Sequence, residues 1–130
     1  MHFNRELYAR GDAPGEKRDC SVRALAVVAC ISYEESLEFF KQAGRETGKG
    51  TKSSTSARAW TLALGHEPDA IKLSEIKTGK VLTLGQLVKA FPVGHYVVHI
   101  SGHALAVTDG IVHDWCPRPR CHVLAAYRFC

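Results

Sequence analysis

Cys20 lies at a position in the sequence where a thiol can become reactive. It opens a stretch with apolar residues at helical spacing that extends to Cys30, and Asp19 stands at the expected N-cap of that helix. The unpaired N–H groups and the positive dipole end of a helix N-terminus favour a thiolate. Asp19 opposes this effect, and three basic neighbours add to it: Lys17, Arg18 and Arg23. Cys20 is therefore the candidate nucleophile, whereas Cys30, among alanines and valines, is expected to be a buried structural thiol.

A nucleophilic cysteine needs a base and a group that orients this base, and both are expected on a late hairpin. Asp109-Gly110 is a strong signal for a two-residue hairpin turn, and with that turn Leu105 faces Asp114. His103 shares a face with Leu105, so His103 and Asp114 become diagonal neighbours about 7–8 Å apart along the backbone, within reach of side-chain contact. A carboxylate there can hold one imidazole nitrogen and leave the other facing the thiol.

Three other residues compete for these two roles. His99 has the strand phase of His103, although a turn near Ser101-Gly102 leaves that phase open. His113 is expected on the opposite face of the hairpin, and Asp109 is better used by the turn. The hairpin pattern therefore favours His103 as the base.

Three stretches of the chain together resemble the papain-like cysteine peptidases, and in particular small members similar to bacteriocin-processing peptidases. The first, 19–25, places a cysteine at the start of an apolar helix. The second, 101–107, is Gly-His followed by an apolar strand, and the third, 112–115, lies on the returning strand. The order of elements agrees over most of the chain, and about twenty residues carry the motifs. The Asp-Cys-x-x-Arg-Ala-Leu start also resembles small phage-encoded proteins.

The resemblance implies a role for each residue of the expected site. Cys20 would be the nucleophile, His103 the general base and acid, and Asp114 the residue that orients His103. The family usually completes its oxyanion hole with a Gln shortly before the cysteine, and residues 14–19 contain no amide side chain. Three alternatives remain for this oxyanion-hole donor. Asn4 folds back to supply it, the backbone N–H of Cys20 acts with another donor, or the site is no longer catalytically active.

The elements expected to position these residues are helices followed by a sheet. The hydrophobic spacing, capping boxes and turn signals predict an irregular arm at 1–19, helices at 20–30, 32–44, 53–65 and 83–91, a short strand at 70–73, and strands at 95–100, 104–108, 111–115 and 122–129. This order is typical of an α+β domain in which N-terminal helices precede an antiparallel sheet.

Composition limits the possible classes of protein. The chain has 130 residues, 45% of them hydrophobic, and a formal charge of +4, which favours one globular domain over residues 1–130. The scattered positive charge gives no indication of nucleic-acid binding, and no apolar run approaches the roughly 20 residues of a membrane span. No signal peptide is evident and the five cysteines are an odd number, so reduced thiols in a cytoplasm are expected, the host cytoplasm if the chain is phage-encoded.

Two further function classes remain open beside a hydrolase of peptide or isopeptide bonds. A structural zinc site could use four possible ligands within ten residues, His113, Cys116, Cys121 and His122. Their spacing matches no standard zinc motif, so neither a metal nor another cofactor is expected. Alternatively, a peptidase-like fold is used without catalysis to bind or inhibit a partner, such as a host protein. The expected partner of the hydrolase is a protein or peptide substrate, and the sequence does not determine an oligomeric state.

Overall fold

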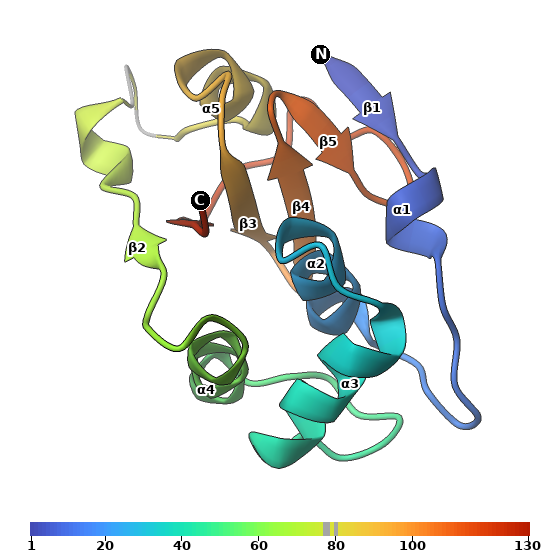
Figure 1. The fold of residues 1–130 in the computed structure, drawn as a ribbon. Helices are drawn as coiled ribbons and strands as arrows, with labels where there is room; N and C mark the ends of the chain where they lie inside the picture. Colours follow the sequence, from blue (N-terminus) through green and yellow to red (C-terminus); the bar gives the residue numbers. More distant parts are fainter. Residues whose placement is uncertain (77–78, 80) are drawn as a thin grey trace.

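A computed structural model describes residues 1–76, 79 and 81–130 of the chain. The fold is α+β, with a six-stranded sheet of order β1-β5-β4-β3-β6-β2 (Figure 1). The strands are β1 (His2–Asn4), β2 (Asp69–Ala70), β3 (His95–Ile100), β4 (His103–Thr108), β5 (Ile111–His113) and β6 (Ala125–Arg128). The helices are α1 (Glu6–Ala9), α2 (Cys20–Val28), α3 (Tyr33–Gln42), α4 (Ser53–Leu64) and α5 (Leu84–Ala90), with a 3-10 turn, η1 (Leu73–Glu75).

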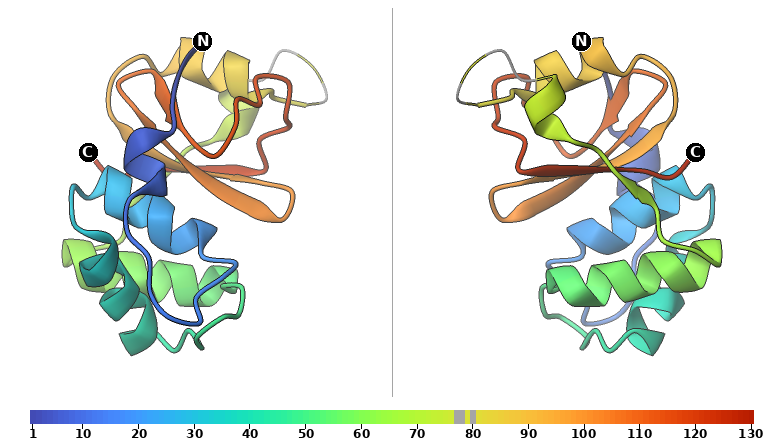
Figure 2. Two further views of the ribbon diagram at one scale, coloured as in Figure 1. Left: turned by 90° about the vertical axis from the view of Figure 1, so that its right-hand side faces the viewer. Right: turned by 90° about the vertical axis from the view of Figure 1, so that its left-hand side faces the viewer.

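Helices cover both faces of the sheet (Figure 2). On one face α2, α3 and α4 pack together, and Val97 and Ala104 join their core. On the other face α5 packs over a second core that includes Val98 and Leu105. Because successive strand residues alternate between faces, the continuous apolar runs of β3 and β4 can serve both cores. No helix among the described residues is long and apolar enough to cross a membrane.

The helix boundaries follow local signals in the sequence. Capping boxes begin α3 at Ser32 and α5 at Thr83, as expected, and Gly65 ends α4 in a left-handed conformation. Lys52 occupies the N-cap position of α4, so Ser53, Ser54 and Ser56 lie inside the first turn of this helix. Cys30 was expected to be buried in a helix, but α2 ends at Val28 and Cys30 is exposed with a positive φ of 56°.

The hairpin register predicted from the Asp109-Gly110 turn is confirmed. Val107 faces Val112 and Ala106 faces His113, as a two-residue turn requires. The preceding hairpin also turns in two residues, with Ile100 facing His103, so His99 and His103 have opposite strand phases and not the shared phase considered above.

The sheet differs from the expected one in its composition and in the bounds of two strands. The arm at 1–19 contains β1 and α1, and β1 runs parallel to β5, so the sheet is mixed and its first strand precedes the helices. The strand expected at 122–129 is restricted to β6, and that at 70–73 is the two-residue β2. Residues 1–9 are too few to show a helical or strand period in their hydrophobic residues. β1 forms by pairing with β5, which lies far away in the sequence.

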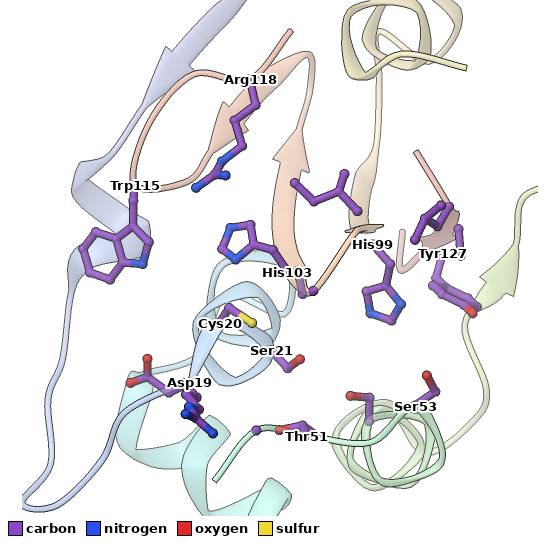
Figure 3. A pocket seen from close by; sticks show the side chains of 18 residues that line it. Asp19, Cys20, Ser21, Thr51, Ser53, His99, His103, Trp115, Arg118 and Tyr127 are labelled. Atoms are coloured by element: carbon purple, nitrogen blue, oxygen red, sulfur yellow. The ribbon is translucent and has the colours of Figure 1, made fainter. Parts of the chain in front are cut away.

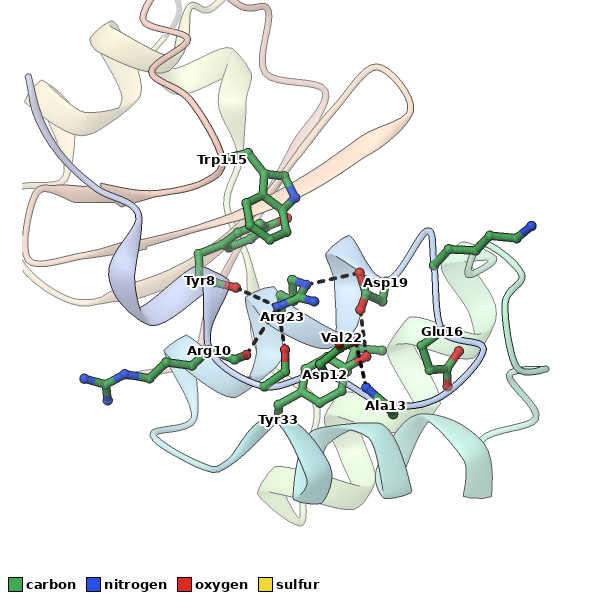
Figure 4. Close-up of polar contacts among 12 residues, drawn as sticks. Tyr8, Arg10, Asp12, Ala13, Glu16, Asp19, Val22, Arg23, Tyr33 and Trp115 are labelled. Atoms are coloured by element: carbon green, nitrogen blue, oxygen red, sulfur yellow. Dashed lines mark hydrogen bonds and ion pairs between the residues drawn. The ribbon is translucent and has the colours of Figure 1, made fainter.

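Two buried arginines attach the N-terminal arm to the helices. Arg23 on α2 donates to the carbonyl groups of Tyr8, Arg10 and Gly11 and pairs with Asp19 (Figure 4). Arg45, which follows α3, pairs with Glu16 at 3.0 Å, and these side chains are 0% and 1% exposed. These contacts fix the segment that leads into Cys20.

Candidate active site

Cys20 is the first residue of α2, and its helix N-terminus is not capped by a side chain. The carboxylate of Asp19 turns away to accept from Arg23 Nε at 3.1 Å and from the Tyr33 hydroxyl at 2.6 Å. The backbone N–H groups of Cys20 and Ser21 therefore find no acceptor among the described residues. The N-terminus of α2 thus remains free to donate to a bound group.

The structure brings Cys20, His103 and Asp114 together. Cys20 and His103 line the same cavity, and the imidazole lowers the pKa of the Cys20 thiol. Nε2 of His103 lies 2.7 Å from Oδ1 of Asp114. Since Nε2 faces the carboxylate, Nδ1 is the ring nitrogen left for the thiol. The diagonal pairing expected from the hairpin register explains this contact.

Asp114 is fully buried, and its carboxylate is surrounded by donors. Oδ1 accepts from its neighbour's backbone N–H, that of Trp115, at 2.7 Å as well as from His103. Oδ2 accepts from Arg118 Nε at 2.9 Å. A buried carboxylate needs such compensation because it has lost its hydration. Asp114 is therefore held in one orientation.

Ala104 connects the thiol to the sheet edge. Because β5 ends at His113, no strand among the described residues pairs with Ala104 on the side of β4 opposite to β3. The Ala104 carbonyl accepts from the buried Tyr8 hydroxyl at 2.8 Å, and the backbone of Ala104 helps to lower the pKa of the Cys20 thiol. The Tyr8 ring packs edge-on against His103, and it also packs edge-on against Trp115 (Figure 4). Tyr8 thus contacts both the His103 ring and the backbone of Ala104.

The surroundings shift both pKa values toward an ion pair. Burial alone would raise the pKa of Cys20, but the hydrogen bonds with His103 and Ala104 and the imidazolium charge lower it below its usual range. Burial alone would lower the pKa of His103, but Asp114 and Cys20 raise it to about 9. Both shifts favour a thiolate beside an imidazolium over the neutral pair.

A cavity of about 790 Å³ has Cys20 and His103 near its middle (Figure 3). Trp115 and Arg118 lie toward one end of it, and His99 and Tyr127 toward the other. The loops 45–54 and 116–121 both contribute to the lining.

Asn4 does not lie in this cavity. Its Oδ1 accepts from the Glu6 N–H at 2.7 Å at the start of α1, and Asn4 is not among the residues lining the cavity. Of the donors considered from the sequence, the backbone N–H of Cys20 is the one at the site.

His113, one of the candidate zinc ligands, makes a side-chain contact within the hairpin. His113 Nε2 lies 2.7 Å from Thr108 Oγ1, on the face away from Asp114 as expected. In the part of the chain that the structure describes, no three His, Cys, Asp or Glu side chains form a group suited to a metal ion.

Sequence reasoning missed Tyr8, Arg118, His99 and Tyr127 as parts of the site. Tyr8 belongs to the arm that was expected to be irregular, and His99 reaches the cavity through the face opposite to His103. Arg118 had a local signal, since it follows Asp114 by four residues in a proline-stiffened loop.

The arrangement has the parts of a thiol nucleophile with its base: an acidified thiol, an oriented imidazole, free backbone donors and an adjoining cavity. Comparisons of the chain with protein-family models, with curated proteins and with solved structures find no match.

Proposed function

We propose that this protein is a thiol hydrolase with a papain-like fold that cleaves a peptide or isopeptide bond. Cys20 acts as nucleophile, His103 as base and acid, and Asp114 orients His103. The observation that carries the proposal is the chain of contacts from the Cys20 thiol through the imidazole to a buried carboxylate. The position of Cys20 at the start of a helix packed on the sheet also supports it.

In the first half of the reaction, the Cys20 thiolate attacks the carbonyl carbon of the substrate. A C–S bond forms and the carbonyl π electrons move to oxygen, where the free N–H groups at the start of α2 can stabilise the charge. When the carbonyl re-forms, the C–N bond breaks and His103 gives its proton to the departing amine. The product is a thioester on Cys20 and a free amine.

In the second half, water attacks the thioester. His103 accepts a proton from the water, the C–O bond forms, and the C–S bond breaks with the electron pair returning to sulfur. The acid product leaves, and the proton on His103 restores the ion pair with the Cys20 thiolate. The Asp114 carboxylate holds the imidazole throughout and stabilises its charged form.

A reducing compartment such as the cytoplasm fits this proposal. All five cysteines are free thiols, and Cys20 must remain reduced to act as a nucleophile. The expected partner is a protein or peptide that enters the cavity.

Iodoacetamide labelling of the native protein across pH, with each thiol identified by mass spectrometry, tests the assembled site. Cys20 should label fastest near neutral pH, with a midpoint below the roughly 8.5 of a free cysteine. The rate should fall in His103→Ala, whereas the exposed Cys130 should label equally in both proteins. Equal labelling rates for Cys20 and Cys130 would contradict the proposal.

Turnover is tested with a mixed library of peptides and isopeptide-linked peptides. Cleavage should be lost in Cys20→Ala and His103→Ala, with circular dichroism and thermal unfolding showing that both variants fold. If Cys20 labels rapidly and the protein captures a peptide without cleaving it, the alternative of a non-catalytic binding protein replaces this proposal.

A further inference from the structure

The proposed function fixes which end of the cavity receives the leaving group. His103 must touch the departing amine to protonate it, so this amine lies beside the imidazole. The wall next to the imidazole is formed by Trp115 and Arg118, and the Arg118 side chain points toward the space between Trp115 and His103 (Figure 3). The opposite end, with His99 and Tyr127, is left for the acyl part of the substrate.

Arg118 has unused hydrogen-bonding capacity at this end. Its Nε donates to Asp114, and its two terminal nitrogens have no acceptor among the described residues. The side chain is 32% exposed and lines the cavity. A guanidinium carries five N–H donors in a fork that matches a carboxylate, so the terminal edge can still bind one.

The charges around Trp115 also favour an anion. The Arg5 guanidinium lies 5.4 Å from the centre of the Trp115 ring and has no ion-pair partner in the described part of the chain. The nearby carboxylates are already engaged, that of Asp19 by Arg23 and that of Asp114 by His103 and Arg118. This end of the cavity therefore has an excess of positive charge.

The acyl end differs in character. Its polar side chains are neutral, because burial lowers the pKa of His99 and the other polar groups there are hydroxyls, those of Thr51, Ser53 and Tyr127. The Thr51 hydroxyl is buried and has no partner among the described residues. The contrast between the two ends assigns a charged group of the substrate to the Arg118 side.

We propose that Arg118 binds a carboxylate on the leaving group. The substrate is then a peptide or isopeptide whose released amine carries a carboxylate close to the scissile bond. This carboxylate is either the α-carboxylate of a C-terminal residue or an acidic side chain. The inference rests on the proposed function.

The first experiment compares two alkylating reagents of nearly equal size, iodoacetate and iodoacetamide. Both form the same C–S bond with Cys20 and release iodide, and they differ in the carboxylate that Arg118 would attract. In Arg118→Gln the ratio of the iodoacetate rate to the iodoacetamide rate should fall about tenfold, as expected from the loss of one charge-assisted contact. Arg118→Lys should keep part of the preference, since it retains the charge.

Arg120→Gln is the matched control, because Arg120 is exposed in the same loop and its loss changes the net charge equally. Its ratio should equal that of the natural protein. If Arg118→Gln lowers both rates by the same factor, Arg118 only positions Asp114 and the carboxylate site is refuted while the proposed function stands. If Cys20 reacts slowly with both reagents in the natural protein, the proposed function fails and this inference fails with it.

The second experiment identifies the source of the carboxylate. L-alanine, L-alaninamide and the α-amide of L-aspartic acid are added as product-like amines, and protection of Cys20 from iodoacetamide is measured. Protection by alanine indicates an α-carboxylate, and protection by the aspartic acid amide indicates an acidic side chain. Equal protection by alanine and alaninamide, with none by the aspartic acid amide, would overturn the inference.

Discussion

Nε2 of His103 lies 2.7 Å from Oδ1 of Asp114, a carboxylate with 0% exposure to solvent. The two residues are eleven positions apart in the sequence, and the hairpin between them turns in two residues. Because the Asp114 carboxylate is buried, its charge is stabilised by hydrogen-bond donors instead of water. The low local dielectric also strengthens its electrostatic interaction with the imidazole. The charges of His103 and Asp114 therefore determine the pKa and the reactivity expected of the Cys20 thiol.

Hydrolysis and alkylation should differ in their pH dependence. Both rates should rise as pH passes the lowered pKa of Cys20, because both need the thiolate. Hydrolysis should fall again as pH passes about 9, where His103 loses the proton it must give to the amine. Iodoacetamide alkylation needs no proton donor and should show no such fall. A common alkaline limb in the two profiles would argue against His103 as the acid.

Asp114→Asn should weaken the ion pair without removing the hydrogen-bond acceptor. The pKa of His103 should fall and that of Cys20 should rise, since the carboxylate charge is lost. A change of one unit in the pKa of the imidazole corresponds to a factor of about ten. Hydrolysis at neutral pH should therefore decrease at least about tenfold, and the alkylation midpoint of Cys20 should move up.

Asp109→Asn is the control for this charge change. Asp109 lies in the turn of the same hairpin, where its side chain accepts from the Gly94 N–H and its φ is 47°. Asparagine tolerates this conformation and keeps the acceptor. Asp109→Asn should leave the Cys20 profile unchanged, and a shift equal to that of Asp114→Asn would assign the effect to general electrostatics.

Tyr8→Phe should change both stability and the reactivity of Cys20. The Ala104 carbonyl would lose its buried donor, at a cost of about 1–3 kcal/mol in the free energy of unfolding. The backbone of Ala104 helps to lower the pKa of the thiol, so a shift of this backbone should also slow alkylation of Cys20. Urea unfolding and labelling measure the two effects.

Tyr96→Phe is the matched control for Tyr8→Phe. The Tyr96 hydroxyl also donates to a backbone carbonyl at 2.8 Å, that of Val93, at the opposite end of β3 from the site. This variant should be destabilised without any change at Cys20. A loss of stability in Tyr8→Phe with unchanged labelling would show that Tyr8 has only a structural role.

Glu16→Gln should destabilise the fold strongly, because it leaves the Arg45 guanidinium buried without its counter-ion. Removing one partner of a buried ion pair typically costs about 3–5 kcal/mol. Glu46→Gln removes an exposed partner of Lys49 and should leave urea unfolding unchanged. Similar unfolding curves for the two variants would show that the Glu16–Arg45 pair contributes little.

The local signals in the sequence are strong where one short segment decides the outcome. The capping boxes at Ser32 and Thr83 fix the start of two helices because their side chains and N–H groups lie within three residues of each other. The Asp109-Gly110 turn fixes the register of β4 and β5 for the same reason. Through that register the sequence predicted the contact of His103 with Asp114.

Other features depend on segments that meet only in the folded chain. β1 pairs with β5 across more than a hundred residues, and nothing in residues 2–4 shows which edge they will find. Cys30 illustrates the same limit, since an apolar neighbourhood predicts burial, whereas the end of α2 at Val28 leaves this thiol exposed.

By itself the sequence determined the α+β class and the positions of Cys20, His103 and Asp114, the proposed nucleophile, base and orienting carboxylate. Capping, turn chemistry and strand alternation could place them because they act over a few residues. Only the tertiary structure decided what surrounds them. Tyr8 packs edge-on against His103 from a distant segment, and His99 reaches the neutral end of the cavity through the opposite strand phase. Their positions depend on long-range packing and on buried ion pairs, for which no local pattern exists.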